Sequence, residues 1–338
     1  MTTTMRAIQA QSFSISGLKV AAVEVPTPGK GEVLIRIKAA TLNYRDLAVL
    51  GGDYIKDLPL PYVPASDACG VVEAVGLGVT RFAIGDRIVP IYTQGWHDGK
   101  PTPEQRAKRT IGAPLPGVLQ DYIVVPEEDA VVPPANLSDL EAASLPIAAV
   151  TAWNALSSAG IKAGDDVLVQ GTGGVSLFAL QFAKLAGARV TILSSSDEKL
   201  QRAKELGADF GINYRSTPDW EVEVKKVTGG RGVDIVVETV GTSLSKSLSA
   251  VAFGGTVSVV GFVAGYSAEL NIRQVIGPMV NIKGIAVGSR RQFQEMNRAI
   301  EQGNIKPVID KVFDLVDSAA AFEHMKKGLH FGKIAIQM

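Results

Sequence analysis

Cysteine and histidine are scarce in this sequence. The chain of 338 residues contains one cysteine, Cys69, and three histidines. A single thiol excludes an intrachain disulfide, and such rarity is typical of a reducing compartment. An excess of either charge is also missing, because Lys plus Arg and Asp plus Glu both number 34. This balance argues against nucleic acid or an anionic membrane surface as the main partner.

Long apolar runs are absent as well. Residues 1–14 have no apolar core of the signal-peptide kind, and the uncharged stretch 142–161 is too polar to cross a bilayer. We therefore expect a cytoplasmic protein without a membrane segment. Hydrophobic residues make up 46% of the chain, which is enough for full-sized cores. The length predicts one large or two ordinary domains.

The strongest pattern present is a glycine turn between two predicted strands. The β-branched run 167–169 predicts a strand buried on both faces, and the run 190–193 predicts another. The turn, Gly171-Thr172-Gly173-Gly174, separates the first strand from a mostly apolar helix expected over 175–185. Strand, glycine turn, helix and strand together form the unit that binds the pyrophosphate of a dinucleotide.

The residues of the turn suit that task. Gly171 permits the tight turn, Gly173 lets the backbone approach a phosphate, and the helix start offers N–H groups and a positive dipole end. Ser176 stands where a third glycine is usual, a packing position that tolerates a small side chain. A P-loop is excluded because no Gly-Lys-Ser/Thr follows. The expected phosphate-binding residues are Gly171, Thr172, Gly173, Gly174 and Val175.

The chain before this unit has a different pattern. Short alternating runs, separated by glycine and proline, predict an antiparallel barrel over residues 1 to about 133; they are 7–10, 33–39, 70–76 and 85–90. Residues 94–119 read as a loop insertion containing Trp96 and His97. Its charged run, 104–109, favours a solvated helical turn over a ligand contact.

From Ser138 the pattern becomes helical and then alternates. Ser138 and Glu141 predict a capping box that opens a helix over 140–145. Strands are expected at 167–169, 190–193, 210–213, 233–238, 256–260 and 282–287, and helices near 150–158, 175–185, 198–206, 220–228, 244–252 and 272–280. This alternation predicts a doubly wound parallel sheet. The tail, 291–338, predicts two helices and a final strand, 333–336, that return to the first domain.

Several stretches together carry a family resemblance. They are Asn43-Tyr44-Arg45-Asp46, the run from Pro64 to Gly76, Gly85-Asp86-Arg87-Ile88, Thr151-Ala152-Trp153 and Gly332-Lys333-Ile334-Ala335. The chain resembles the medium-chain dehydrogenase/reductase superfamily, in its zinc-independent branch similar to quinone oxidoreductases. The resemblance implies a GroES-like catalytic domain over 1–147 and 289–338, with a Rossmann dinucleotide-binding domain inserted over 148–288. It also implies homodimers that pair strands near 282–287.

The zinc-dependent members differ from this chain at the metal. Residues 41–46 contain no cysteine, Ser66 and Asp67 replace the family's His-Glu pair, and the four-cysteine structural loop is missing. His324 and His330 favour surface or capping roles. His97 does so too, although its loop could also overhang the substrate cleft. We therefore expect no metal.

The end of the second predicted strand decides the cofactor. An NAD site places a carboxylate there, whereas this chain has Ser194 and Ser195, and Asp197 and Glu198 favour the first turn of the next helix, with Ser195 and Glu198 as a capping box. Lys199 and Tyr214 suit a 2′-phosphate, and their counterparts in quinone reductases face that phosphate. The alternatives are a solvated helix lysine and a half-buried strand end. We favour NADPH over NADH. The resemblance adds Thr151, Gly261, Phe262 and Lys333 to the cofactor-binding set.

The resemblance also places candidate catalytic residues opposite the nicotinamide. They are Asn43, Tyr44, Asp46 and Tyr54, with Asp67 contacting Arg45 or another base. Ala48 stands where some quinone reductases carry a tyrosine, which weakens the transfer of their substrate preference. We predict NADPH-dependent reduction of quinones or α,β-unsaturated carbonyl compounds, because conjugated acceptors need little carbonyl polarisation. A metal-free alcohol dehydrogenase acting on plain carbonyls, or a non-catalytic NADPH-binding protein, remains an alternative.

Overall fold

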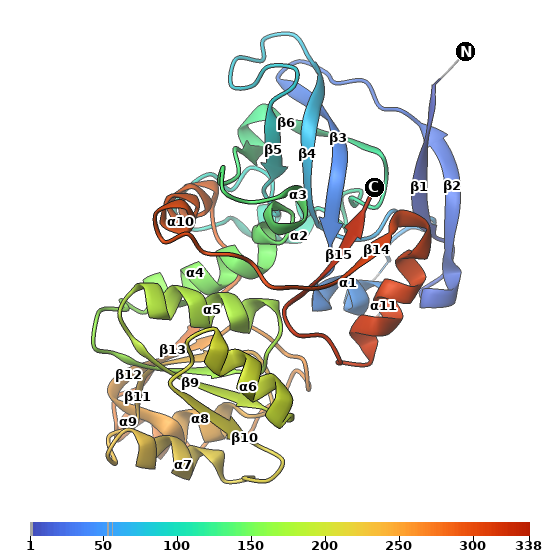
Figure 1. Cartoon of the computed structure of the whole chain (residues 1–338). Helices are drawn as coiled ribbons and strands as arrows, with labels where there is room; N and C mark the ends of the chain where they lie inside the picture. The colour runs from blue at the N-terminus through green and yellow to red at the C-terminus, as the bar shows by residue number, and fades with distance from the viewer. Residues whose placement is uncertain (1–2, 53, 56) are drawn as a thin grey trace. The chain divides into compact units, whose positions relative to one another are not determined.

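The computed structural model describes residues 3–52, 54–55 and 57–338. The chain divides into two compact units. The first unit combines Met1–Val150 with Gly288–Met338, and the second unit is Thr151–Val287 (Figure 1). Each unit has its own sheet and its own core.

The second unit is built on a six-stranded parallel sheet. The strands lie in the order β10-β9-β8-β11-β12-β13, and every pairing between them is parallel. Their bounds are Asp166–Gln170 (β8), Arg189–Ser194 (β9), Phe210–Asn213 (β10), Val233–Glu238 (β11), Val251–Val259 (β12) and Asn281–Gly284 (β13). All five residues of β8 are buried, as its β-branched run predicted. The strand order reverses between β8 and β11, which is where ligands bind in doubly wound sheets.

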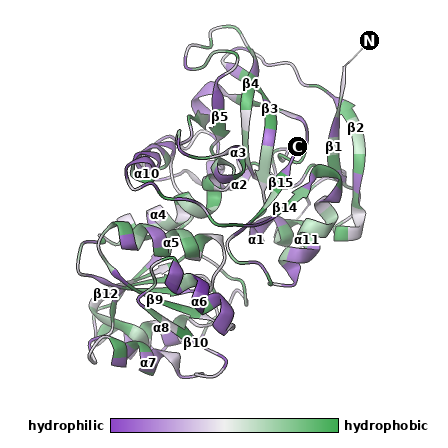
Figure 2. Cartoon of the chain, in the orientation of Figure 1, coloured by the Kyte–Doolittle hydropathy of each residue, from purple (hydrophilic) through white to green (hydrophobic). Residues whose placement is uncertain are grey.

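Helices cover both faces of this sheet (Figure 1). Their bounds are Val150–Ser157 (α4), Gly174–Leu185 (α5), Asp197–Glu205 (α6), Trp220–Val227 (α7), Leu244–Ala250 (α8) and Arg273–Ile276 (α9). The predicted doubly wound α/β fold is therefore confirmed. Figure 2 shows the expected division, with mainly hydrophobic strands and a largely hydrophilic α6.

Three boundaries predicted for the second unit are wrong. The helix expected over 244–252 ends at Ala250, because Val251 already pairs with Val233 at the start of β12. The helix expected over 272–280 shortens to α9. The strand expected over 282–287 ends at Gly284 as β13, which lies at the edge of the sheet with all four of its residues exposed.

The first unit is a β domain with a mixed sheet. Seven strands follow the order β14-β15-β3-β4-β5-β7, with β6 paired to β3, and β1 and β2 form a separate hairpin. Their bounds are Thr4–Ala10 (β1), Leu18–Glu24 (β2), Glu32–Thr41 (β3), Asp67–Val75 (β4), Arg87–Pro90 (β5), Tyr122–Pro126 (β6), Ala130–Val131 (β7), Ile309–Asp314 (β14) and Lys333–Gln337 (β15). The strands of residues 1 to about 133 pair antiparallel, as predicted, whereas β14 and β15 from the tail run parallel to each other.

Short helices complete the first unit. Their bounds are Tyr44–Leu50 (α1), Pro103–Lys108 (α2), Asp139–Ala142 (α3), Arg290–Gln302 (α10) and Ser318–Lys326 (α11). The Ser138–Glu141 capping box is confirmed, but the helix it opens ends at Ala142 and a separate π-helical turn follows over Leu145–Ala149. The predicted helical turn in the loop insertion is α2.

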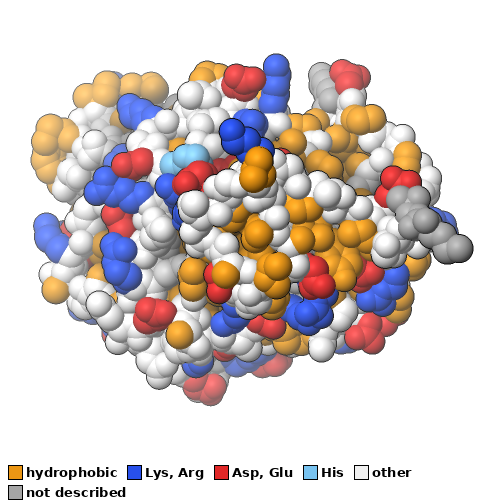
Figure 3. All heavy atoms as spheres, turned by 90° about the horizontal axis from the view of Figure 1, so that it is seen from above, with side chains coloured by type: hydrophobic (Ala, Val, Ile, Leu, Met, Phe, Trp, Pro, Cys, Tyr) orange, Lys and Arg blue, Asp and Glu red, His pale blue; other side chains and the backbone are white. Residues whose placement is uncertain are grey.

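The surface carries no single-sign field on the face viewed from above. Basic and acidic side chains alternate there, with hydrophobic side chains gathered between them (Figure 3). Among the described residues, no helix combines the length and the apolar character needed to cross a bilayer.

Candidate active site

The candidate catalytic residues of the first unit begin at the start of α1. Asn43 is the N-cap, and its backbone N–H donates to Asp46 Oδ2 at 2.8 Å, which fixes both residues. Lys333, from the opposite end of the chain, donates from Nζ to Leu42 O at 2.8 Å and to Asn43 Oδ1 at 2.7 Å. An interaction across 290 positions therefore joins the last strand to the first helix.

Asp67 completes a buried cluster with these residues. It opens β4 and is fully buried, and its Oδ2 accepts from Asn43 Nδ2 at 2.9 Å and from Ile147 N at 3.3 Å. Lys333 Nζ lies 3.6 Å from the same oxygen. Burial raises the pKa of Asp67 to about 6, against the opposing charge of Lys333, and burial lowers the pKa of Lys333. Burial therefore opposes both charges of this pair, and the attraction between the two groups offsets part of that effect.

Arg45 belongs to a neighbouring network rather than to Asp67. Its Nη1 donates to Ser66 Oγ at 2.8 Å, Ser66 donates to Asp46 Oδ1 at 2.7 Å, and Arg45 lies 3.5 Å from that same oxygen. Of the two partners expected for Asp67, the contact with Arg45 is therefore wrong and the contact with another base, Lys333, is found.

The two tyrosines lie at the border of these clusters. The ring of Tyr54 lies 5.7 Å from the Arg45 guanidinium, and Tyr44, the first residue of α1, keeps 41% of its surface exposed. The first unit therefore gathers Asn43, Asp46, Asp67 and Lys333 in its interior, with Tyr44 exposed and Tyr54 half-buried beside them.

The glycine turn of the second unit has the geometry expected of a phosphate site. Gly171 adopts a φ of 75°, which favours glycine, and a Cβ on Gly173 would meet no atom within 4 Å. Gly173 is the N-cap of α5, so the first N–H groups of the helix follow directly after this open position. Ser176 is buried and donates from Oγ to Gln170 O at 2.6 Å, so it ties the helix to β8.

The end of β9 differs from the prediction in its helix cap. Ser196, not Ser195, is the N-cap of α6, and its Oγ accepts from Lys199 N at 3.3 Å; Glu198 therefore does not close a capping box. Ser194 is buried, and its carbonyl accepts from Tyr214 N at 3.0 Å, so Tyr214 lies beside the strand end. Asp197 accepts from Asn213 Nδ2 at 2.8 Å, which holds that carboxylate at the first turn of α6.

A buried carboxylate near the turn was missed from the sequence. Glu238, at the end of β11, accepts from the backbone N–H groups of Val240 at 2.9 Å and Gly241 at 3.0 Å, from Gln170 Nε2 at 2.8 Å and from Ser247 Oγ. The sequence feature that could have indicated it is an acidic residue at the end of an otherwise apolar strand. Glu238 ties the residue before the glycine turn to the loop after β11.

The other residues assigned to the cofactor lie around this loop or nearby. The N–H of Gly261 donates to Glu238 O at 3.3 Å, and a Cβ on Gly261 would lie 2.5 Å from Thr239 O, so only glycine fits. Phe262 stacks on Tyr266 with ring centroids 4.8 Å apart. Thr151 is buried in α4. Lys333 belongs to the first unit, whereas the glycine turn belongs to the second.

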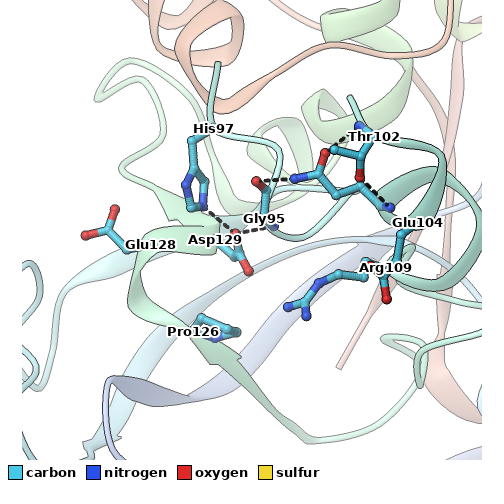
Figure 4. Close-up of a pocket in the computed structure, with 9 residues that line it drawn as sticks. Gly95, His97, Thr102, Glu104, Arg109, Pro126, Glu128 and Asp129 are labelled. Atoms are coloured by element: carbon cyan, nitrogen blue, oxygen red, sulfur yellow. Dashed lines mark hydrogen bonds and ion pairs between the residues drawn. The ribbon is translucent and has the colours of Figure 1, made fainter. Parts of the chain in front are cut away.

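The loop insertion forms a pocket of about 500 Å³ in the first unit (Figure 4). His97 Nε2 lies 2.8 Å from Asp129 Oδ1, which also accepts from Gly95 N at 2.7 Å. Arg109 and Glu104 line the other side. His97 thus serves to hold its own loop against η2 (Glu127–Asp129).

Comparisons with known proteins agree with this architecture. Residues 29–135 match the sequence profile described as the alcohol dehydrogenase GroES-like domain, and residues 174–302 match the one described as zinc-binding dehydrogenase. The chain is 44% identical to the zinc-type alcohol dehydrogenase-like protein C1773.06c of Schizosaccharomyces pombe, over 95% of each chain. It is 30% identical to human quinone oxidoreductase, over 90% of this chain and 88% of that protein.

A solved structure shows the same fold. The crystal structure of a putative alcohol dehydrogenase from Sinorhizobium meliloti superposes with a TM-score of 0.94 at 42% identity, covering all of both chains. A GroES-like unit with a buried polar cluster and a doubly wound unit with a glycine turn define a two-domain oxidoreductase. The chain belongs to the medium-chain dehydrogenase/reductase family, and the fold class predicted from its sequence is confirmed.

Because the names of some relatives mention zinc, we compared the donor atoms around Asn43 with the ligands that a zinc ion prefers. Around Asn43 the available donors are amide, hydroxyl and carboxylate oxygens, and an ammonium group already lies 2.7 Å from Asn43 Oδ1. The described residues contain no group of three or more His, Cys, Asp or Glu side chains that could hold a metal ion. This set does not fit a tetrahedral zinc ion.

Proposed function

We propose that this protein is a zinc-independent, NADPH-dependent oxidoreductase that reduces quinones or α,β-unsaturated carbonyl compounds by hydride transfer. The observation that carries the proposal is the buried cluster of Lys333, Asn43 and Asp67, where an ammonium group lies among the donors. Conjugated acceptors spread the charge that develops on oxygen, so they depend least on a metal ion. NADPH supplies the hydride, and a proton from water completes the reduced product.

The candidate catalytic residues divide into two roles under this proposal. Tyr44 and Tyr54 are the hydroxyl donors to the acceptor oxygen, because Tyr44 is 41% exposed and Tyr54 is only half-buried. Asn43, Asp46 and Asp67 are buried and are joined by hydrogen bonds, and Lys333 donates to Asn43. They act as positioning residues that fix the start of α1, and with it Tyr44.

The dinucleotide is assigned to the second unit. Its pyrophosphate would meet the N–H groups that follow Gly173, at the start of α5 and beside the switch point of the sheet. The loop that Glu238 holds, 239–241, and the backbone at Gly261 and Phe262 follow neighbouring strand ends, β11 and β12. These segments would flank the ribose and nicotinamide parts.

The preference for NADPH rests on the end of β9. Ser194, Ser195, Lys199 and Tyr214 supply hydroxyl and ammonium groups there, and Asp197 is bonded to Asn213. A cation and neutral donors suit a phosphate dianion, which a carboxylate placed to accept from the ribose would repel.

An acceptor assay tests the reaction. With NADPH, we expect an enone to be reduced at least tenfold faster than the saturated ketone of the same carbon skeleton, and we expect activity to survive metal chelation. Turnover of the ketone alone would support the alternative, a metal-free alcohol dehydrogenase. Tight NADPH binding without oxidation by any acceptor would support a binding protein. Stoichiometric zinc required for turnover would refute zinc independence.

A binding titration tests the cofactor. Replacing Lys199 or Tyr214 by Ala should weaken NADPH binding about tenfold and leave NADH binding within about twofold, because one charge-assisted contact to the 2′-phosphate is lost. Lys204→Ala is the matched control, since Lys204 is an exposed lysine of the same helix. Equal weakening of both dinucleotides by Lys199→Ala would contradict the assignment.

We also propose a homodimer formed through β13. This strand is the exposed edge of the sheet, and a group of exposed apolar side chains surrounds it: Phe253, Ile272, Ile276, Met279 and Ile282. An unpaired edge strand with apolar neighbours is suited to pairing with a second copy.

A further inference from the structure

Several buried polar atoms of the first unit have no hydrogen-bond partner among the described residues. Four of them belong to Arg45 (Nε), Tyr62 (hydroxyl), Thr93 (Oγ1) and Arg106 (Nη1). A buried polar group without a partner is unfavourable by roughly 1–3 kcal/mol, so such groups signal a missing ligand or water. The groups of Arg45, Thr93 and Arg106 come from segments of the chain that meet around Tyr92, and Tyr62 lies near Arg45.

Arg45 is fixed in place on one side of Tyr92. Its Nη1 donates to Ile111 O at 3.2 Å and its Nη2 to Ala113 O at 2.8 Å, in addition to the bond with Ser66. The guanidinium carbon lies 5.0 Å from the centre of the Tyr92 ring. Nine tenths of the residue is buried, yet Nε–H remains an unused donor.

Arg106 approaches the same tyrosine from α2. Burial raises the pKa of the Tyr92 hydroxyl, and the charges of Arg45 and Arg106 both act against that shift, so both cations lie near this hydroxyl. Backbone bonds hold the segments together, since Ile111 N donates to Tyr92 O at 3.1 Å and Gln94 N to Arg109 O at 2.8 Å. Thr93 also pairs with Thr110 across this junction.

The cluster has an excess of positive charge and of donors. Arg45 is balanced by Asp46 at 3.5 Å, whereas Arg106 has no carboxylate within 4.0 Å in the described part of the chain. The unused groups are two guanidinium N–H donors and two hydroxyls, which can donate as well. The single positive charge of Arg106 would be neutralised by one carboxylate, whose two oxygens also suit planar N–H donors. A phosphate dianion carries two negative charges, and one of them would have no compensating cation.

We propose that Arg45, Arg106 and Thr93, which lie around the Tyr92 ring, form a subsite for a carboxylate on the acceptor, so that the enzyme prefers an acidic enone or quinone. This inference rests on the proposed function, because it adds a specificity group to the same reaction. Arg45 offers Nε–H from a fixed position, and Arg106 supplies the balancing charge. Both belong to the unit that also holds the candidate catalytic residues of α1.

The test compares trans-4-oxo-2-pentenoate with its methyl ester, which differ by one negative charge. We expect the wild-type enzyme with NADPH to show a kcat/KM at least tenfold higher for the acid. Arg106→Gln should lower the acid-to-ester ratio about tenfold. Lys108→Gln removes the same charge from an exposed position of α2 and should leave the ratio at its wild-type value.

The outcomes separate this inference from the proposed function. Reduction of the ester as fast as the acid, or an unchanged ratio in Arg106→Gln, overturns the carboxylate subsite and leaves the reductase intact. If neither compound oxidises NADPH, calorimetry decides on the subsite, and the proposed function fails only if quinones and other enones give no oxidation either. Tenfold tighter binding of the acid than of the ester, lost in Arg106→Gln, supports it, and equal binding of the two overturns it.

Discussion

Burial of Asp67 beside Lys333 makes the stability of the first unit depend on pH. The pKa of Asp67 is raised to about 6 in the folded chain, above its ordinary value near 4 in an unfolded one. The folded state therefore binds the additional proton between these values. The stabilisation that comes from this proton on Asp67 is fully present below about pH 4 and is lost as pH rises through about 6.

This linkage gives a measurable outcome. The free energy of unfolding of the wild type, relative to Asp67→Asn, should fall between about pH 4 and pH 6, because only the wild type has a carboxyl group to ionise in the cluster. Urea unfolding at half-unit pH steps measures the difference. Glu104→Gln, at an exposed carboxylate, should give no comparable trend. A difference for Asp67→Asn that stays flat across this range would contradict the raised pKa.

The sequence indicated single residues of the site more readily than it indicated which of those residues contact one another. Asn43, Asp46 and Asp67 were identified by resemblance, and they do lie together. Lys333 was assigned to the cofactor, because nothing in its local sequence indicates a contact with Asn43 that is 290 positions away. Glu238 escaped notice for a similar reason, since its partners come from three segments and only the folded sheet brings them together.

At the scale of elements, Ser196 caps α6, whereas the neighbouring Ser195 is assigned to the cofactor, so the two serines should affect stability differently. Ser196→Ala should destabilise the protein by about 1 kcal/mol, because the side chain caps the N–H of Lys199. Ser195→Ala should change stability by less than about 0.5 kcal/mol, the usual range for positions without such a role. Chemical unfolding measures both. Equal losses from the two variants would contradict the assignment of the cap to Ser196.

Elements with a strong local pattern were predicted well, and those set by pairing were not. The run 167–169 and the helix after the glycine turn match β8 and α5 closely, because burial on a parallel sheet leaves a clear apolar signature. β14 was missed because its sequence is largely charged and exposed, and pairing with β15 alone makes it a strand. The start of β12 was read as helix because its pairing with β11, and not its own composition, fixes that boundary.

At the scale of the whole molecule, the exposed edge strand of the second unit's sheet is the expected contact between two copies of the chain. Among the described strands β13 pairs only with β12, and Ile276 of α9 and Ile282 of β13 are 70% and 41% exposed. Joining two copies edge to edge would continue the sheet across the pair and cover these side chains. Such an interface is symmetric, so a change at one position acts twice in the dimer.

We therefore expect the wild type to be a dimer in solution and the double variant Ile276→Glu, Ile282→Glu to be a monomer. The variant places two pairs of like charges at the proposed interface and removes its apolar contacts, which together should weaken association by several kcal/mol. Sedimentation equilibrium measures the mass. Leu77→Glu, Leu329→Glu is the matched control, because both leucines are strongly exposed and lie in the first unit, away from β13. That control should stay dimeric. A monomeric wild type, or dissociation in the control alone, would mean that β13 is not the contact between copies.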